Sequence, residues 1–502
     1  MKSFPWAWSF QDELKGGRSG LVKRSKPTPS IFSFLSFPGC PVAPMAQSIQ
    51  QQLWQASTDG NLVTVRRLLQ ENPRVDVNFI EADEPGKLDT PLHRACRFGH
   101  LEIVKELLAH PEIVANKGNQ GDASPFYIAC QEGQVEVVRW LLTQERLEVT
   151  RPNKNGATPI FIACQNGHVE MAKLLLGDSR TNVNQPKSDG STPLYFACRN
   201  GHLAIVALLL TDPRVDLNLE NNRQVVPLCS ACNKGHEEVV ALLLADPRVD
   251  PNAARWDKKT PFLNACQQGR ASIVRRMLVD PRVDVRAVDD EGFGPMHAAG
   301  HYDHHDLVSL LLTDHRIDPN LTDVDHCTPL WLASQNGHLL VVKHLLASSR
   351  DINTKIISLY TNKTAAEQGR QMAIEEKQDD DTKEEYQRSV TNGPLCASLI
   401  DDYDRDPDSV RLLLRCDSQI RGHYIGHTFA LLVFFADGFL RLKGTASEST
   451  RRFFDLCVAL PLELQMMVCS RMFASPKDVV TSKDSEPGFR WLARSTTWAA
   501  AV

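Results

Sequence analysis

Apolar and polar positions follow a pattern that repeats along most of the chain. In a unit such as 189–220, an apolar stripe at helical spacing within residues 193–200 is followed by a second stripe within residues 202–210. A glycine separates the two stripes, and the polar segment DPRVDLN follows the second one. This pattern predicts two short helices joined by a turn, then an extended arm that leads to a hairpin tip and the next pair.

The unit recurs with a period of 34 residues. Thr192 is a typical helix N-cap, and Pro193 suits the first helical position, where a missing N–H costs little. Ser124, Val226 and Gly294 replace the capping threonine in other copies, and only the serine can accept the same hydrogen bond. Each copy has an alanine four residues after its proline and a leucine seventeen residues after it; the prolines are Pro91, Pro125, Pro159, Pro193, Pro227, Pro261, Pro295 and Pro329.

These residues resemble the ankyrin repeat, whose signature is Thr-Pro-Leu-His-x-Ala, then Gly-His and a leucine-rich second helix. The resemblance covers residues 50–354 and implies an all-α solenoid of helix–turn–helix units with short hairpin tips, because one unit cannot bury its own apolar face. We assign residues 50–89 to a degenerate N-terminal capping repeat without Thr-Pro-Leu-His, and residues 90–354 to eight repeats. In one of these, Asp303 replaces the glycine between the helices, a position that requires a left-handed backbone.

The flanking segments differ from the repeats. We expect residues 1–44 to be a disordered leader or a non-native extension, with Met45 as the biological start. Residues 355–416 read as a decayed repeat, an acidic linker (EEKQDDDTKEE) and a closing helix pair. We expect residues 417–502 to form a small C-terminal helical module, although an Asp-Gly pair at 437–438 leaves a hairpin open as the weaker alternative.

Composition and cysteine positions narrow the possible functions. A formal net charge of −5 gives no reason to expect a nucleic-acid partner, and no apolar run reaches the roughly eighteen residues of a membrane helix. Neighbouring helices lie about 8–10 Å apart, too far for disulfides between the repeated cysteines. We therefore predict small buried thiols and a reducing compartment, either cytoplasm or nucleus. The repeated cysteines are Cys96, Cys130, Cys164, Cys198, Cys232 and Cys266.

Two further clusters raise the question of metal or redox chemistry. The Cys229-x-x-Cys232 motif has no second pair, and His301 and His305 at i and i+4 are interrupted by the turn at Asp303. We interpret both clusters as structural and expect neither a metal nor a cofactor. The sequence has no nucleophile elbow and no phosphate loop, so we expect no enzyme activity.

Two repeated residue types leave a structural and a functional interpretation open. Aromatic residues occupy the signature histidine position and either form a ligand-stacking stripe or pack repeat on repeat; they are Tyr127, Phe161, Tyr195 and Trp331. The resemblance implies that asparagines of the arm can be hydroxylated by a dioxygenase, whereas local chemistry favours a side chain bonded to its own turn. These asparagines are Asn184, Asn218, Asn252 and Asn320. We favour the structural interpretation of both sets.

The resemblance also implies where a protein partner would bind. In ankyrin stacks, the hairpin tips and the exposed side of the first helices form a long concave surface. Phe98, Tyr302 and Phe293 are anchor candidates if they are exposed, since aromatic residues and arginines dominate interface energies. The full candidate set comprises Arg97, Phe98, Glu132, Asn166, Arg199, Asn200, Lys234, Gln268, Tyr302 and Asn336 on the first helices, and Asn222, Arg223 and Phe293 on the tips.

The C-terminal tail suggests an alternative function. Within ALPLELQMM, the residues Leu460, Pro461, Glu463 and Leu464 are similar to the opening of an F-box, which binds the Skp-type adaptor of cullin ubiquitin ligases. The Val-Cys-x-x-Trp part of that motif is not in place, because Val468 and Cys469 come too early and no tryptophan follows at the right distance. The tail is therefore either a plain capping helix or a ligase-binding segment, which would make the protein a substrate adaptor.

Overall fold

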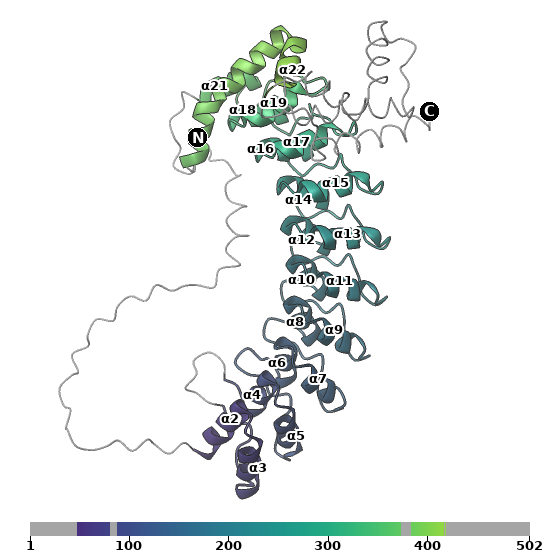
Figure 1. Cartoon of the computed structure of the whole chain (residues 1–502), viewed down its shortest axis with the longest axis vertical. Helices are drawn as coiled ribbons and strands as arrows, with labels where there is room; N and C mark the ends of the chain where they lie inside the picture. The colour runs from purple at the N-terminus through teal and green to yellow at the C-terminus, as the bar shows by residue number, and fades with distance from the viewer. Residues whose placement is uncertain (1–47, 81–87, 373–382, 416, 418–502) are drawn as a thin grey trace, which may run out of the picture.

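The computed structural model describes residues 48–80, 88–372, 383–415 and 417, and every regular element in this part of the chain is a helix. Nine helix pairs stack along one axis, with the first helix of each pair in one layer and the second in the other (Figure 1). The first helices are α2 (Ile49–Asp59), α4 (Pro91–Phe98), α6 (Pro125–Gln131), α8 (Pro159–Asn166), α10 (Pro193–Asn200), α12 (Pro227–Lys234), α14 (Pro261–Gln267), α16 (Pro295–His301) and α18 (Pro329–Gln335). The second helices are α3 (Leu62–Glu71), α5 (Leu101–Ala109), α7 (Val135–Leu141), α9 (Val169–Leu176), α11 (Leu203–Leu210), α13 (Glu237–Ala245), α15 (Ala271–Val279), α17 (His305–Leu312) and α19 (Leu339–Ala347).

Local chemistry explains where the first helices begin. The Thr192 side chain accepts a hydrogen bond from the Tyr195 N–H at 3.1 Å, and Ser124 caps α6 in the same way. Val226 makes no side-chain cap, as expected for an aliphatic residue. At Gly294 the roles are reversed, because the backbone N–H of the glycine donates to Nδ1 of the histidine three residues later.

The turn between the two helices of a pair requires a left-handed residue. Gly201 has a φ of 75° there, and Asp303 adopts the same region with a φ of 60°. The histidine after this turn ties its repeat to the preceding one: His202 Nε2 donates to the carbonyl of Gln165 at 2.9 Å. This bond satisfies a carbonyl near the C-terminus of the preceding first helix, which has no partner within the helix.

The DPR sequence of the arm forms a second tie between repeats. The Arg214 guanidinium pairs with the Asp212 carboxylate at 2.6 Å and donates to the carbonyl of Leu176, at the end of the preceding second helix. The same guanidinium lowers the pKa of Asp212 below its usual value. The arrangement recurs at Arg180, Arg248, Arg282 and Arg316.

The repeated asparagines form a third tie, and here the prediction of a bond to the residue's own turn is wrong. The side chain of Asn218 reaches forward into the next repeat, donating to the Arg248 carbonyl at 2.8 Å and accepting from the Asp250 N–H at 2.9 Å. Asn184, Asn252 and Asn320 do the same. We call this set of contacts the asparagine ladder. Its partners lie some thirty residues away, so a local turn interpretation could not find them.

The core lies between the two helix layers and contains the repeated cysteines. All six are fully buried and free, and burial raises the pKa of the Cys164 thiol to about 12. Cys229, which completes the Cys-x-x-Cys motif with Cys232, is buried as well. The aromatic residues at the histidine position are also buried, which supports packing between repeats rather than a ligand-stacking stripe.

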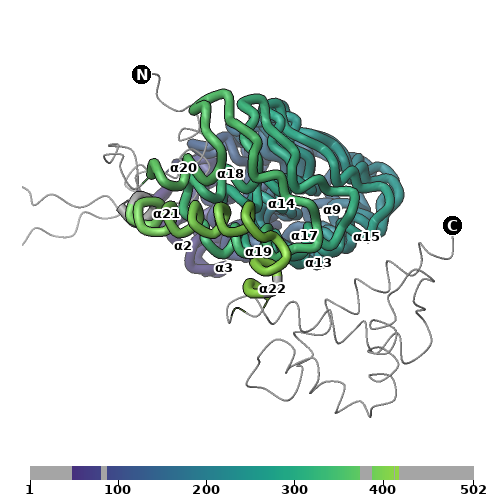
Figure 2. Tube along the Cα trace, turned by 90° about the horizontal axis from the view of Figure 1, so that it is seen from above, coloured from purple at the N-terminus to yellow at the C-terminus, as the bar shows by residue number. Residues whose placement is uncertain are grey.

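The C-terminal end of the stack is covered by α20 (Ala365–Met372), α21 (Lys383–Arg405) and α22 (Pro407–Arg415). Helix α20 packs on α18 and α21, and α22 packs on α19 (Figure 2). A side-chain carbon on Gly369 would lie 2.6 Å from the Gly393 carbonyl oxygen, so the crossing of α20 and α21 depends on glycine. The leader, most of the acidic linker and the F-box-like residues Leu460, Pro461, Glu463 and Leu464 lie outside the described residues.

Candidate binding surface

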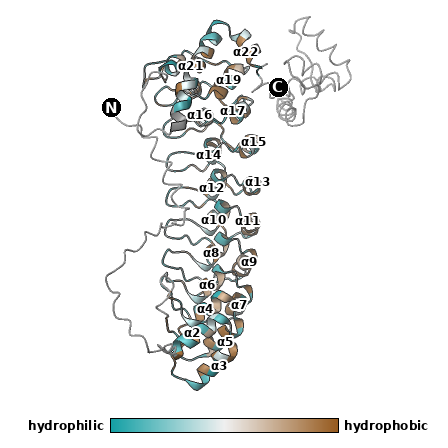
Figure 3. Cartoon of the chain, turned by 60° about the vertical axis from the view of Figure 1, so that its left-hand side comes forward, coloured by the Kyte–Doolittle hydropathy of each residue, from teal (hydrophilic) through white to brown (hydrophobic). Residues whose placement is uncertain are grey.

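The candidate residues lie on one side of the stack. The loops that precede the first helices project away from the second helices as a row of tips, with the first helices between the two (Figure 3). We call this side the first-helix surface. Exposed candidates are Phe98, Glu132, Asn166, Asn200, Asn222, Arg223 and Lys234, and half-buried ones are Arg97, Arg199, Gln268, Tyr302 and Asn336.

Several of the polar candidates are partly occupied by contacts within the stack. The carboxamide of Asn166 donates to the Gln131 carbonyl at 3.0 Å, and that of Asn200 donates to the Gln165 carbonyl at 2.8 Å. Asn222 and Asn336 make corresponding bonds to the preceding repeat. These side chains therefore help to fix adjacent repeats, and a partner can use only their remaining hydrogen-bonding capacity.

Phe98 is the most exposed aromatic candidate. It is the last residue of α4, and 46% of its surface is accessible to solvent. The guanidinium carbon of Arg94 lies 5.1 Å from the centre of its ring and 4.4 Å from that of Trp54 on α2. The guanidinium thus makes a cation–π contact with each of the two aromatic rings. Neither Trp54 nor Arg94 was among the predicted residues, although Arg94 lies one helical turn before the predicted Phe98.

A buried carboxylate orders the charges beside Phe98. Asp89 is 2% exposed, and its side chain accepts from Arg97 at 2.9 Å and from the Asn119 amide at 2.9 Å. Arg97 also pairs with Glu132 on the next repeat at 2.8 Å. The guanidinium of Arg97 is thus fixed between two carboxylates, so its orientation on the surface is set before any partner arrives.

Phe293 does not qualify as an exposed anchor. Only 8% of its surface is accessible, and its ring stacks on His297 at a centroid distance of 5.2 Å. Phe293 lies two residues before the repeat proline, where small residues such as Ala157 and Ser191 are also buried. These small residues at the same position of other repeats were the sequence signal that Phe293 would be buried.

Tyr302 is half-buried by its neighbours. Its ring meets His301 edge-on at 4.6 Å, and its hydroxyl accepts from the Gln267 side chain at 3.2 Å. Burial raises the pKa of the Tyr302 hydroxyl above its usual value. Tyr302 can therefore offer a partner only the part of its ring that the stack leaves open.

A second aromatic and cationic cluster lies in the middle of the array and was not predicted. Phe196 packs on Phe161 at 5.1 Å, and the Lys187 ammonium lies 4.6 Å from the centre of the Phe196 ring. Arg199, a predicted residue, lies 5.9 Å from the same ring. The sequence signal was the aromatic residue that directly follows the tyrosine at the histidine position.

The arrangement offers recognition groups rather than reactive ones. In the part of the chain that the structure describes, no three histidine, cysteine, aspartate or glutamate side chains are grouped to hold a metal ion. None of the helices described there is both long and apolar enough to cross a membrane.

Comparisons with known proteins agree with the repeat architecture. Residues 53–152, 144–221 and 262–356 match the family described as "Ankyrin repeats (3 copies)", and residues 228–278 match "Ankyrin repeats (many copies)". Over 51 residues the chain is 43% identical to "Ankyrin repeat and LEM domain-containing protein 2" of Mus musculus. These 51 residues are 10% of this chain, and the matched part is 5% of the mouse protein. The similarity thus spans about one twentieth of that relative. The family matches extend over more than half of the chain, which belongs to the ankyrin-repeat family.

Proposed function

We propose that the protein is a non-catalytic scaffold that binds a protein partner on its first-helix surface, the concave face of an ankyrin array. Ankyrin repeats imply protein partners, and exposed aromatic and arginine side chains supply most of the energy in interfaces. The observation that carries the proposal is Phe98, which is 46% exposed and held by Arg94 at the end of α4. The buried free cysteines support a reducing compartment, cytoplasmic or nuclear.

Affinity purification with Phe98→Ala tests this proposal. Truncation of an interface anchor of this kind costs about 2 kcal/mol, so we expect about thirtyfold weaker binding and a clear loss of retained partner. Val63→Ala is the matched control, because Val63 is 78% exposed on α3, in the second-helix layer. Equal recovery of every partner by the wild type, Phe98→Ala and Val63→Ala would remove Phe98 as the anchor.

A second candidate function rests on the F-box-like residues of the tail. If Leu460, Pro461, Glu463 and Leu464 recruit a cullin-type ligase, the array selects the substrate and the tail binds the ligase. A truncation after Asp417 separates the two functions, because it keeps α20–α22 and the 2.9 Å ion pair between Lys343 and Asp417. Ligase subunits that co-purify only with the full chain support the adaptor function. The same partners from both forms would place recognition in the repeats alone.

A further inference from the structure

The asparagine ladder is broken at one joint. Asparagine residues in the arms bridge to the next repeat at positions 78, 116, 184, 218, 252 and 320. At position 286 an arginine supplies the donor half of the bridge, since its Nε donates to the Arg316 carbonyl at 3.2 Å. At position 150 the residue is a threonine, for which no bridge exists within the described residues.

Thr150 leaves two backbone groups without partners. In the neighbouring joints the asparagine binds the carbonyl thirty residues later and the N–H thirty-two residues later, as Asn184 does with Arg214 and Asp216. The equivalent groups after Thr150 are the Arg180 carbonyl and the Asn182 N–H. Across the described segments of the chain, neither group takes part in a hydrogen bond.

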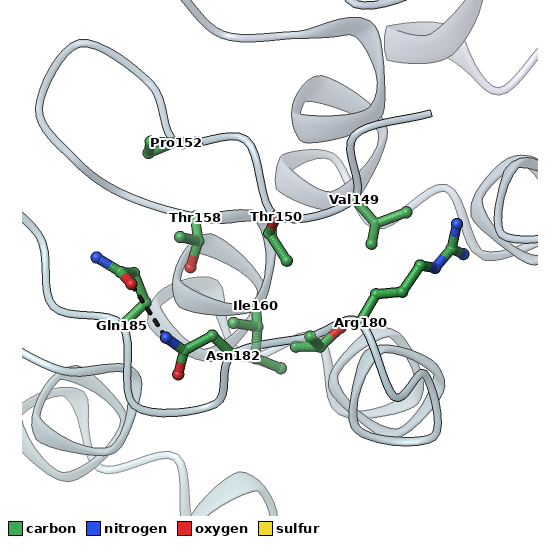
Figure 4. A pocket seen from close by; sticks show the side chains of 9 residues that line it. Val149, Thr150, Pro152, Thr158, Ile160, Arg180, Asn182 and Gln185 are labelled. Carbon is green, nitrogen blue, oxygen red and sulfur yellow. Dashed lines mark hydrogen bonds between the residues drawn. The ribbon is translucent and has the colours of Figure 1, made fainter. Parts of the chain in front are cut away.

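A pocket lies at this joint. It has a volume of about 340 Å³ and is formed by the arms of two successive repeats and the start of α8 (Figure 4). Val149, Pro152 and Ile160 give it apolar walls. Thr181 also lines the pocket, although its hydroxyl oxygen is buried away from the pocket space and has no hydrogen-bond partner among the described residues. The backbone groups without partners at this joint belong to Arg180 and Asn182, which both line the pocket.

We infer that this pocket binds the carboxamide of an asparagine or glutamine side chain from a partner peptide. A carboxamide carries both a donor for the Arg180 carbonyl and an acceptor for the Asn182 N–H, so it reproduces the two bonds that the ladder makes elsewhere. The apolar walls accommodate the methylene groups of the bound side chain. A carboxylate has no donor for the Arg180 carbonyl, and an ammonium group has no acceptor for the Asn182 N–H.

The pocket is a separate site from the first-helix surface. None of the residues that line it belongs to the candidate set of that surface. A volume of about 340 Å³ is at the small end of ligand pockets and exceeds what one amide group fills, so neighbouring peptide atoms enter with the side chain. The inference therefore does not depend on the function proposed for Phe98.

The test is a selection of displayed twelve-residue random peptides on the full chain, with binders then measured on three variants. Thr150→Asn places an internal carboxamide in the pocket, so the selected peptides should bind it at least about tenfold more weakly. Thr150→Ala leaves the joint open and should bind them about tenfold more tightly than Thr150→Asn does. Glu220→Ala lies in another arm, outside the pocket, and should bind the peptides as the wild type does.

The outcomes separate clearly. The selected peptides should share an asparagine or glutamine whose replacement by aspartate, glutamate or leucine lowers the affinity about tenfold. Thr150→Asn should also resist urea better than the wild type, which shows that it folds and completes the ladder. Peptides without such a residue, equal binding to Thr150→Asn and Thr150→Ala, or no discriminating peptide at all would each overturn the inference.

Discussion

Replacing Asn218 by threonine should reproduce, in the middle of the array, the interruption that Thr150 makes naturally. The wild-type side chain makes two bonds to the next repeat, at 2.8 Å to the Arg248 carbonyl and at 2.9 Å to the Asp250 N–H. A hydrogen bond of this kind contributes about 0.5–1.5 kcal/mol net, so the pair contributes about 1–3 kcal/mol. Because Arg248 and Asp250 are exposed and water can reach the released groups, we expect a loss of about 1–2 kcal/mol.

The assay should report on the joint as well as on the whole chain, because long repeat arrays can unfold in more than one step. A urea titration followed by circular dichroism gives the global change, and hydrogen exchange of the segment 246–252 gives the local one. Glu220→Ala is the control, since Glu220 is exposed in the same arm and makes no hydrogen bond or ion pair within the described residues. Asn218→Thr and Glu220→Ala with equal urea midpoints and equal exchange would refute the view that the ladder stabilises the array.

Two further predictions concern helix caps and a buried histidine. Thr192→Val should lower the free energy of unfolding by about 1 kcal/mol because α10 loses its cap, and Val226→Thr should raise it by a similar amount because α12 gains one. Urea titrations check both changes. A shift of the same sign in the two variants would contradict the capping argument. Burial lowers the pKa of His297 from its ordinary 6.5 to about 4, and its Nδ1 already accepts a hydrogen bond from the Gly294 N–H. As the pH falls, His297 therefore takes up a proton in the unfolded chain before it does so in the folded one, which favours unfolding. The free energy of unfolding should therefore decrease by up to about 3 kcal/mol between pH 6.5 and pH 4. The decrease should be smaller in His297→Tyr. Parallel pH profiles of the wild type and this variant would exclude His297 as a source of the pH dependence.

The sequence predicted the helix pairs because their determinants are local. In the described repeats, a threonine before the proline caps the first helix, and the exceptions at Ser124, Val226 and Gly294 behave as their side-chain chemistry requires. The left-handed turn at Asp303 was also readable, since few residues besides glycine, asparagine and aspartate adopt that backbone.

The contacts between repeats were less accessible to prediction. Asn218 bonds residues 30 and 32 positions away, a distance at which nothing in the local sequence distinguishes a bridge from a turn. The burial of Phe293 could have been suspected by comparing the same position across repeats, because several repeats have a small residue there, such as Ala123, Ala157 and Ser191. The pocket beside Thr150 exists where the arm lacks the asparagine carboxamide that other repeats have. The sequence shows this substitution, but its consequence can be inferred only once the bonds of the other arm asparagines are known.

The uneven ladder also has a mechanical consequence. Wherever the arm asparagine makes both bonds, rotation of one repeat against the next must break two hydrogen bonds in addition to the packing. The joint after Thr150 has neither bond, and the joint after Arg286 has only one. The array is therefore a rod of non-uniform bending stiffness, with a rigid central section over residues 184–284 and more compliant joints on either side. A partner that spans position 150 must fix that angle when it binds, whereas a partner confined to the central section meets a surface whose curvature is already set.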